Sequence, residues 1–245
     1  MTKLLFLDDS YIREFDATVT GHAGENGITL DRTAFYAGGG GQPNDVGKIS
    51  DGEHTWQVTK VGKVDGEVVH TLEGDELPEV GAKVHGVVDW DRRYKLMRTH
   101  TALHILCGVI FQEYGAQVTG ANMDVDHARM DFELEDLNSE RVAHIQTIIN
   151  DKVQEDLPIS WRTLPREEAF QIPDLIRTKI NLLPAGIQEV RVLEIHGLDL
   201  QADGGTHVRN TREVGGIAIT GTRSKGRINK RLTIEVRDEP VETAG

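Results

Sequence analysis

The spacing of the apolar residues changes near residue 92, and this change constrains the fold more than any other feature. Before it, β-branched residues occur in short runs that Gly, Asn and Asp interrupt at turn positions, as in residues 14–36, 58–72 and 81–91. Short strands at this spacing are typical of a small antiparallel barrel. We therefore expect a glycine-rich β-barrel domain over residues 1–92.

From Arg93 onward the apolar residues follow a helical period. One face of the expected helix carries apolar side chains and two histidines, namely Leu96, Met97, His100, Leu103, His104, Cys107, Ile110 and Phe111. Gly115 is expected to end this helix. A second helix is expected to have Ser139 as its N-cap and to stop before Pro158. A short helix is expected to have Pro165 in its first turn.

Four later segments have the composition of strands: residues 129–134, 189–198, 214–222 and 228–236. Long helices combined with such strands indicate an α+β fold, with helices lying on an antiparallel sheet. The second domain is therefore expected over residues 93–245.

The composition excludes several classes of protein. Of the 245 residues, 38% are hydrophobic and 27% are charged, as in ordinary soluble proteins. No apolar run approaches the length of a membrane span, and the N-terminus reaches Asp8 too soon for a signal peptide. The single cysteine, Cys107, excludes an internal disulfide. We therefore predict a cytoplasmic protein.

The formal net charge of −13 argues against a general binder of polyanions. A nucleic-acid partner would need a localised basic patch instead.

Two clusters of histidine indicate a metal site. His100 and His104 stand four residues apart on the first helix, so both imidazoles can grip one ion. Asp203 and His207 bracket two glycines that allow the backbone to turn tightly. Each cluster alone is equally compatible with polar residues that serve only the structure. Together they offer three imidazoles and one carboxylate, enough for a tetrahedral or five-coordinate site.

Four segments carry a resemblance to a known family. Residues 30–47, 98–106, 129–133 and 201–215 resemble the editing module of alanyl-tRNA synthetase and the free-standing AlaX proteins, and the length resembles the AlaX-M class. The resemblance covers about residues 5–237. It implies an N-terminal β-barrel, a two-layer α/β editing domain, and hydrolysis of the ester that joins serine, and to a degree glycine, to alanine tRNA. Nothing resembles an aminoacylation core, so we expect the chain to deacylate tRNA and not to charge it.

The resemblance further implies a zinc cofactor with His100, His104 and His207 as ligands, and a zinc-activated water as the attacking group. The family commonly reads CGGTH where this chain has Asp203 as the first residue. A carboxylate can ligate zinc or can orient a ligand from behind, and it makes manganese or iron less excluded. Cys107 is either a substitute ligand or a small core residue, and His196 either a base or a structural histidine.

Two segments are candidates for contact with the amino acid. Thr119 aligns with a threonine that the family uses near the amino-acid pocket, but it is equally compatible with a plain turn. The segment of Gly38, Gly39, Gly40, Gly41 and Gln42 resembles the family motif implicated in telling serine from alanine. Glycines allow close backbone approach to a ligand, although a flexible hairpin tip explains them too.

For the tRNA, residues 222–231 form a basic stripe in an acidic chain, with Arg223, Lys225, Arg227, Lys230 and Arg231 and no acid among them. Such a stripe suits phosphate groups near the acceptor end, or it is a solvated hairpin. We expect tRNA as the partner, with no membrane and no obligate protein partner.

Two other functions stay open at this point. One is a metal-dependent deacylase of another aminoacyl-tRNA, such as threonine tRNA, or of a small ester. The other is a non-catalytic tRNA-binding module in which Asp203 has abolished metal binding.

Overall fold

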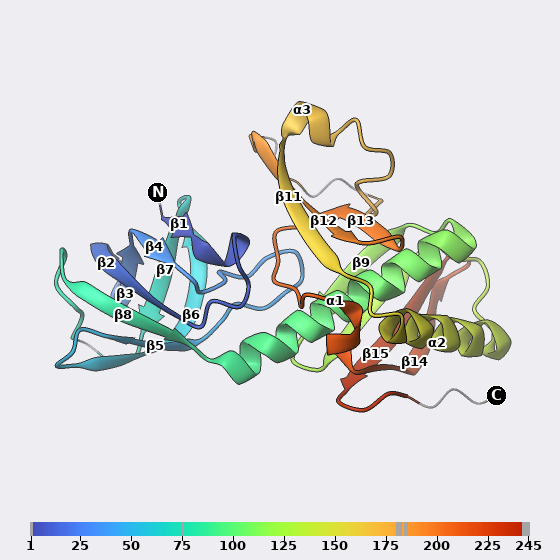
Figure 1. Ribbon diagram of the computed structural model, residues 1–245, viewed down its shortest axis with the longest axis horizontal. Coiled ribbons are helices and arrows are strands. Elements are labelled where there is room, and N and C mark those ends of the chain that lie inside the picture. The colour runs from blue at the N-terminus through green and yellow to red at the C-terminus, as the bar shows by residue number, and fades with distance from the viewer. Residues whose placement is uncertain (1, 75, 180–182, 184–185, 242–245) are drawn as a thin grey trace. The chain divides into compact units, whose positions relative to one another are not determined.

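The computed structural model describes residues 2–74, 76–179, 183 and 186–241, and it has the predicted α+β fold (Figure 1). The chain divides into two compact units, Met1–Leu96 and Met97–Gly245. This division falls inside helix α1 (Trp90–Tyr114), because the helix begins in the first unit and ends in the second. The domain boundary at residue 92 stays a prediction.

The first unit is built around a closed antiparallel barrel, as predicted, with strand order β2-β3-β7-β6-β5-β8. Its strands are the blue and teal arrows of Figure 1: β2 (Glu14–Ala23), β3 (Gly27–Leu30), β5 (Gly47–Ser50), β6 (Thr55–Val64), β7 (Glu67–Leu72) and β8 (Lys83–Val88). Outside it, β1 (Lys3–Leu4) pairs with β4 (Arg32–Thr33), and a 3-10 turn, η1, covers Leu5–Leu7. Alternate side chains fill the barrel, so its core is apolar.

A buried ion pair joins the start of α1 to the rest of this unit. Arg93 on the first turn of α1 and Asp45 are both buried and contact each other directly. The Arg93 guanidinium also donates to the carbonyl oxygens of Ser10 (3.0 Å) and Ala34 (2.6 Å). Because a buried charge is costly unless fully paired, this network fixes the start of α1 against the chain around the barrel.

His70 is a buried histidine in the barrel. Its Nε2 lies 2.8 Å from Thr33 Oγ1, and its ring meets Phe35 edge to face. Burial lowers the pKa of His70 to about 4 from an ordinary value of 6.5. The ring is therefore neutral in the folded barrel at any pH well above 4.

Acid should destabilise the barrel through His70. Below pH 6.5 the unfolded chain takes up a proton that the folded barrel excludes, so stability falls as the pH falls from 6.5 to 4. Across that window the loss is about 3 kcal/mol. His70→Gln, which can still bond to Thr33 and does not titrate there, should remove this part of the pH dependence. Urea unfolding at several pH values measures this. The same pH dependence of the free energy of unfolding in both proteins would contradict it.

The second unit contains two antiparallel sheets. The larger has the order β14-β15-β10-β9, with β9 (Val118–Met123), β10 (His127–Phe132), β14 (Gly216–Gly226) and β15 (Asn229–Arg237). The smaller has the order β11-β12-β13, with β11 (Ile159–Pro165), β12 (Glu189–Ile195) and β13 (Asp199–Ala202). The predicted antiparallel strands of this unit are thus divided between two sheets. Strand β11 is half-exposed and rich in polar residues, so its alternation is weak in the sequence.

The helices follow the sequence signals closely. Helix α1 ends at Tyr114, and Gly115 follows with a φ of +63°. Helix α2 spans Ser139–Gln154, but its N-cap is Asn138 and not Ser139, since the Asn138 side chain accepts from the Arg141 amide at 2.8 Å. The short helices are α3 (Arg166–Ala169), preceded by Pro165 at its N-cap, and the 3-10 turn η2 (Thr211–Val214). Among the described residues no helix has the length and apolarity needed to cross a membrane.

Candidate metal centre

The structure brings the four predicted ligands together. His100 and His104 come from α1, and Asp203 and His207 from the loop after β13. One ligand atom from each of the four lies within 4.8 Å of the others. Asp203 Oδ1 is 3.6 Å from His100 Nε2 and 3.9 Å from His104 Nε2, and Asp203 Oδ2 is 2.9 Å from His207 Nε2.

Local structure in the helix and in the loop places two candidate ligands in each. The four-residue spacing puts the His100 and His104 rings 5.2 Å apart on one face of α1. In the loop, Asp203 Oδ2 accepts from the Gly205 amide at 2.7 Å. The buried Arg191 donates to the carbonyl oxygens of Asp203 (3.2 Å) and Gly205 (3.1 Å). The two glycines and Arg191 therefore aim Asp203 and His207 at the same point.

These donors fit a divalent transition metal. Bonds of about 2.0–2.2 Å in a tetrahedral zinc site place the ligand atoms roughly 3.3–3.5 Å apart, close to the spacings between Asp203 and the three imidazoles. Three nitrogen donors disfavour calcium and magnesium, which prefer oxygen. His207 Nε2 lies 2.9 Å from Asp203 Oδ2, a hydrogen-bond distance, so a metal bound here would replace the proton that the two atoms share. The cluster could therefore hold a metal ion.

A second layer of side chains orients two of the imidazoles. His104 Nδ1 lies 2.9 Å from Asp199 Oδ2, which also accepts from Gln201 Nε2 at 2.6 Å. His207 Nδ1 lies 3.2 Å from Thr101 Oγ1. With a proton on each Nδ1, both Nε2 atoms keep a lone pair for a metal, an arrangement common around metal-bound histidine.

Asp199 was missed in the sequence. It lies in β13, four residues before Asp203, and its side chain is buried with Arg177 Nε 3.5 Å from Oδ1. Gly108 lets α1 approach this segment, since a Cβ there would come within 2.9 Å of the Leu198 carbonyl oxygen. An acid four residues before Asp203 is the signal that the sequence carried.

The pKa values of three of the four residues agree with a metal-binding role. Burial lowers the pKa of His100 well below its ordinary value and that of His207 to about 4, so both rings are neutral. For His104, burial acts in the same direction, but hydrogen bonds to Asp199 and Asp203 outweigh it and raise the pKa to about 9. This ring therefore keeps a proton at neutral pH that a metal ion would have to displace. Burial would raise the pKa of Asp203, but the neighbouring imidazoles hold it well below its usual range. The carboxylate is thus ionised, as a ligand must be.

Cys107 and His196 have structural surroundings. Cys107 is 1% exposed, and burial raises the pKa of its thiol. It is not one of the four converging residues, and its Sγ lies 3.3 Å from Gln201 Nε2. His196 Nε2 lies 2.9 Å from Ser160 Oγ at the end of the small sheet. The core reading of Cys107 and the structural reading of His196 both agree with these contacts.

The glycine segment is a tight turn in the first unit. Gly39 and Gln42 exchange backbone hydrogen bonds of 3.1 and 2.9 Å, and Gly40 and Gly41 between them have φ of +57° and +93°. Gly38 and Gly39 also have positive φ, and the Gln42 side chain is buried. Because L residues rarely adopt these angles, the turn itself requires glycine. A contact of this turn with the amino acid stays a prediction.

Thr119 lies exposed on β9, at the edge of the larger sheet. Its contact with the serine hydroxyl stays a prediction.

The basic stripe divides in the structure. Lys225 and Arg231 both contact Asp131, while Arg223 and Arg227 are exposed. Lys230 is buried, and its Nζ donates to the carbonyl oxygens of Gly226 and Arg227, both at 2.9 Å. The alternation of β15 explains this, because Lys230 falls on the same side as the buried Leu232. The Lys230 side chain is thus not exposed to solvent, as a phosphate-binding stripe would require.

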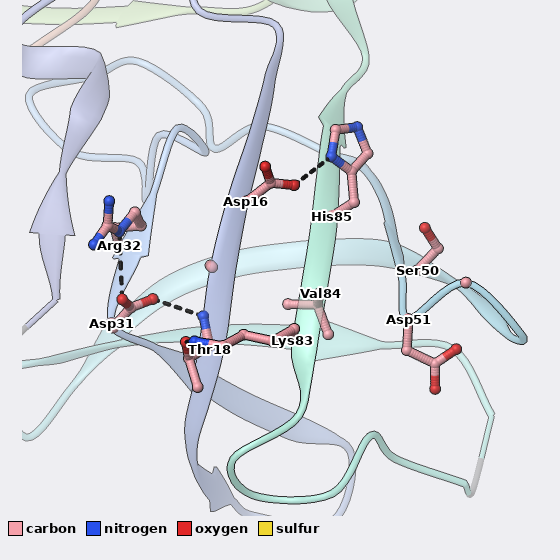
Figure 2. Close-up of a pocket in the computed structure, with 11 residues that line it drawn as sticks. Asp16, Thr18, Asp31, Arg32, Ser50, Asp51, Lys83, Val84 and His85 are labelled. Carbon is pink, nitrogen blue, oxygen red and sulfur yellow. Dashed lines mark hydrogen bonds and ion pairs between the residues drawn. The ribbon is translucent and has the colours of Figure 1, made fainter.

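A hollow on the outside of the barrel is a weaker candidate site. Figure 2 shows its lining, which includes Asp16, Thr18, Asp31, Lys83 and His85 around a volume of about 750 Å³. Its charged groups already have partners: Asp16 bonds to His85 at 2.9 Å, Asp31 accepts from the Thr18 amide at 2.7 Å, and Lys83 donates to Thr18 Oγ1 at 2.7 Å. No predicted site residue lines it. The metal centre is the better candidate.

Comparison with known proteins gives the same picture. The family model described as tRNA synthetases class II (A) matches residues 8–92. The model described as the threonyl and alanyl tRNA synthetase second additional domain matches residues 190–233. The second match includes Asp199, Asp203 and His207.

The relatives match nearly the whole chain. The alanyl-tRNA editing protein AlaX-M of Methanosarcina barkeri is 38% identical over 244 residues, covering 97% of this chain and 100% of that protein. AlaX-M of Saccharolobus solfataricus is 38% identical over 239 residues, with the same coverage. The alanine–tRNA ligase of Pyrobaculum calidifontis is 40% identical over 225 residues, which cover 89% of this chain and 25% of the ligase. With this identity over its full length, the chain belongs to the AlaX-M family of alanyl-tRNA editing proteins.

Proposed function

We propose that this protein is a trans-acting aminoacyl-tRNA deacylase that removes serine, and more weakly glycine, from mischarged alanine tRNA with a water activated by zinc. The observation that carries the proposal is the buried cluster of His100, His104, Asp203 and His207. The names of the relatives, alanyl-tRNA editing proteins, support the substrate. A translation substrate also agrees with a cytoplasmic location.

The residues of the centre divide into those that would hold the ion and those that position them. His100, His104, His207 and Asp203 would hold the ion. With protons on their Nδ1 atoms, which face Asp199 and Thr101, His104 and His207 would direct their Nε2 lone pairs at the ion, and Arg191 holds the backbone of the loop. When bound, zinc supplies Lewis acidity and lowers the pKa of water to about 7, which suits an ester that is already activated.

The geometry disfavours the non-catalytic alternative. Replacing the family's usual cysteine by Asp203 keeps a ligand atom in the cluster, since both carboxylate oxygens lie near imidazole nitrogens. A carboxylate is an established zinc ligand. Four donor atoms near one point support metal binding over its loss.

Selectivity between serine and alanine tests the substrate. The wild type should hydrolyse serine-charged alanine tRNA far faster than the alanine-charged form. A site that hydrogen-bonds a substrate hydroxyl discriminates against the analogue without that hydroxyl by up to roughly 10⁴-fold. Release of labelled amino acid from both forms, and from serine-charged threonine tRNA as a control, measures this. Equal hydrolysis of both alanine tRNA forms would favour a general esterase, and faster hydrolysis of the threonine tRNA would favour the other editing substrate.

The glycine turn needs variants chosen for its backbone. A Cβ on Gly40 would meet no atom within 4 Å, but the φ of +57° strains any L residue there. Gly40→Asn is the milder change, since asparagine tolerates this region. If the turn approaches the seryl group, this variant should narrow the serine-to-alanine ratio.

A further inference from the structure

The larger sheet of the second unit has one apolar and one polar face. On β10 and β15 the residues Met130, Phe132, Leu232 and Ile234 are buried. The residues between them point to the opposite side, which we call the outer face. Strand alternation therefore puts Arg129, Asp131, Arg231 and Thr233 on the outer face together.

The strand register gathers basic side chains on the outer face. Asp131 pairs with Arg231, and Arg231 pairs with Arg223, so these three form one row across β10, β15 and β14. Arg129 stands two residues before Asp131 on the same face. Lys225 reaches the same place from the end of β14. We call Arg129, Asp131, Arg223, Lys225 and Arg231 the outer-face cluster.

Asp131 holds two of these cations in position. Arg231 Nε and Nη2 donate to its carboxylate at 2.6 and 2.8 Å, and Lys225 Nζ donates at 2.9 Å. The hydrogen bond from Arg231 is the main reason that the pKa of Asp131 falls to about 2. The carboxylate is thus ionised at neutral pH, and it offsets only one of the four cations of the cluster.

Arg129 and Arg223 are the cations left for a partner. Both are exposed, and neither makes an ion pair or hydrogen bond with another residue in the described part of the chain. Beside them the sheet carries Gly120, paired with Asp131, and Gly221, paired with Thr233. Without side chains at these two positions, a bulky backbone can approach the sheet closely.

Polyanion binding is the function that fits this surface. A chain with a formal net charge of −13 repels polyanions over most of its surface, so four cations on one face stand out. Three of them are arginines, whose planar guanidinium groups bind phosphate through two hydrogen bonds.

We propose that the outer face of the sheet β14-β15-β10-β9 binds the phosphate backbone of the tRNA, with Arg129 and Arg223 as direct contacts and Asp131 as the residue that positions Arg231 and Lys225. This rests on the proposed function for the identity of the RNA. It keeps Arg223 from the basic stripe of residues 222–231, assigns the contact to the sheet face, and adds Arg129, which lies outside the stripe.

Equilibrium binding of uncharged tRNA tests the proposal without requiring catalysis. The variant combines Arg129→Ala and Arg223→Ala, and fluorescence anisotropy measures its Kd for alanine tRNA between 50 and 300 mM salt. Loss of two phosphate contacts should raise Kd about 10- to 30-fold near 150 mM salt. It should also reduce the slope of log K against log salt by roughly 1.4–1.8. The matched control, Lys60→Ala with Lys63→Ala, removes two exposed lysines from barrel strand β6 and should change neither quantity.

The outcomes separate this proposal from the proposed function. If the arginine variant binds tRNA with the Kd and salt slope of the wild type, the outer face is not the tRNA surface, whatever the hydrolysis assay shows. A drop in affinity with unchanged metal content and unchanged hydrolysis at saturating tRNA supports it. If the wild type binds tRNA through these arginines but hydrolyses no mischarged form, the surface stands and the deacylase assignment falls. An equal loss of affinity in the lysine control would make the effect one of general charge and would overturn the proposal.

Discussion

His104→Ala should abolish metal binding and deacylation together while the barrel stays folded. The substitution removes one of four converging donors and also leaves Asp199 buried without the imidazole that it bonds. Metal analysis should find about one equivalent of zinc per wild-type chain and none in the variant. His144→Ala, which changes a histidine at the surface of α2 near Glu113, is the matched control.

A graded variant separates ligand loss from ligand orientation. Asp199→Asn keeps His104 Nε2 in the cluster but removes the charge behind Nδ1. Loss of such a partner typically weakens metal affinity about 10- to 100-fold, so zinc should still bind at higher concentration. A competition titration with a chelator measures this. The metal mechanism would be overturned if the wild type contained no metal and the activity of His104→Ala survived a chelator.

The features that were predictable from the sequence are those that depend on local spacing. The barrel follows from strand runs that turn residues separate, and α1 from a helical period over Leu96, Met97 and Leu103. His100 and His104 could be paired because four residues make one helical turn. The glycine turn was also visible, although its positive φ values show that the backbone requires glycine there.

The features that were missed depend on contacts between distant segments. Asp199 lies 95 positions from His104, and only the fold of β13 beside α1 makes them neighbours. The partnership of Arg93 with Asp45 spans 48 positions and has no local pattern. Lys230 differs, because the alternation of Lys230, Leu232 and Ile234 could have shown that it faces the core side. Counting charges along the hairpin hid that alternation.

Asp203 gives the sharpest test of whether a carboxylate ligates the metal. Asp203→Ala removes the only carboxylate of the cluster, together with the acceptor of the Gly205 amide. Zinc affinity should therefore fall by about 100-fold or more, beyond the range expected for a partner that only orients a ligand. Hydrolysis at limiting zinc should fall with it.

Asp203→Cys should instead keep zinc and much of the activity, because a thiolate is also a strong zinc ligand and is the residue that the family commonly has at this position. The softer donor should also change metal preference, so manganese or iron should support the wild type better than the cysteine variant. Zinc titration and metal-reconstitution assays on the three proteins measure both effects. Wild-type zinc affinity and turnover in Asp203→Ala would show that Asp203 is no ligand, and the three histidines alone would then have to hold the ion.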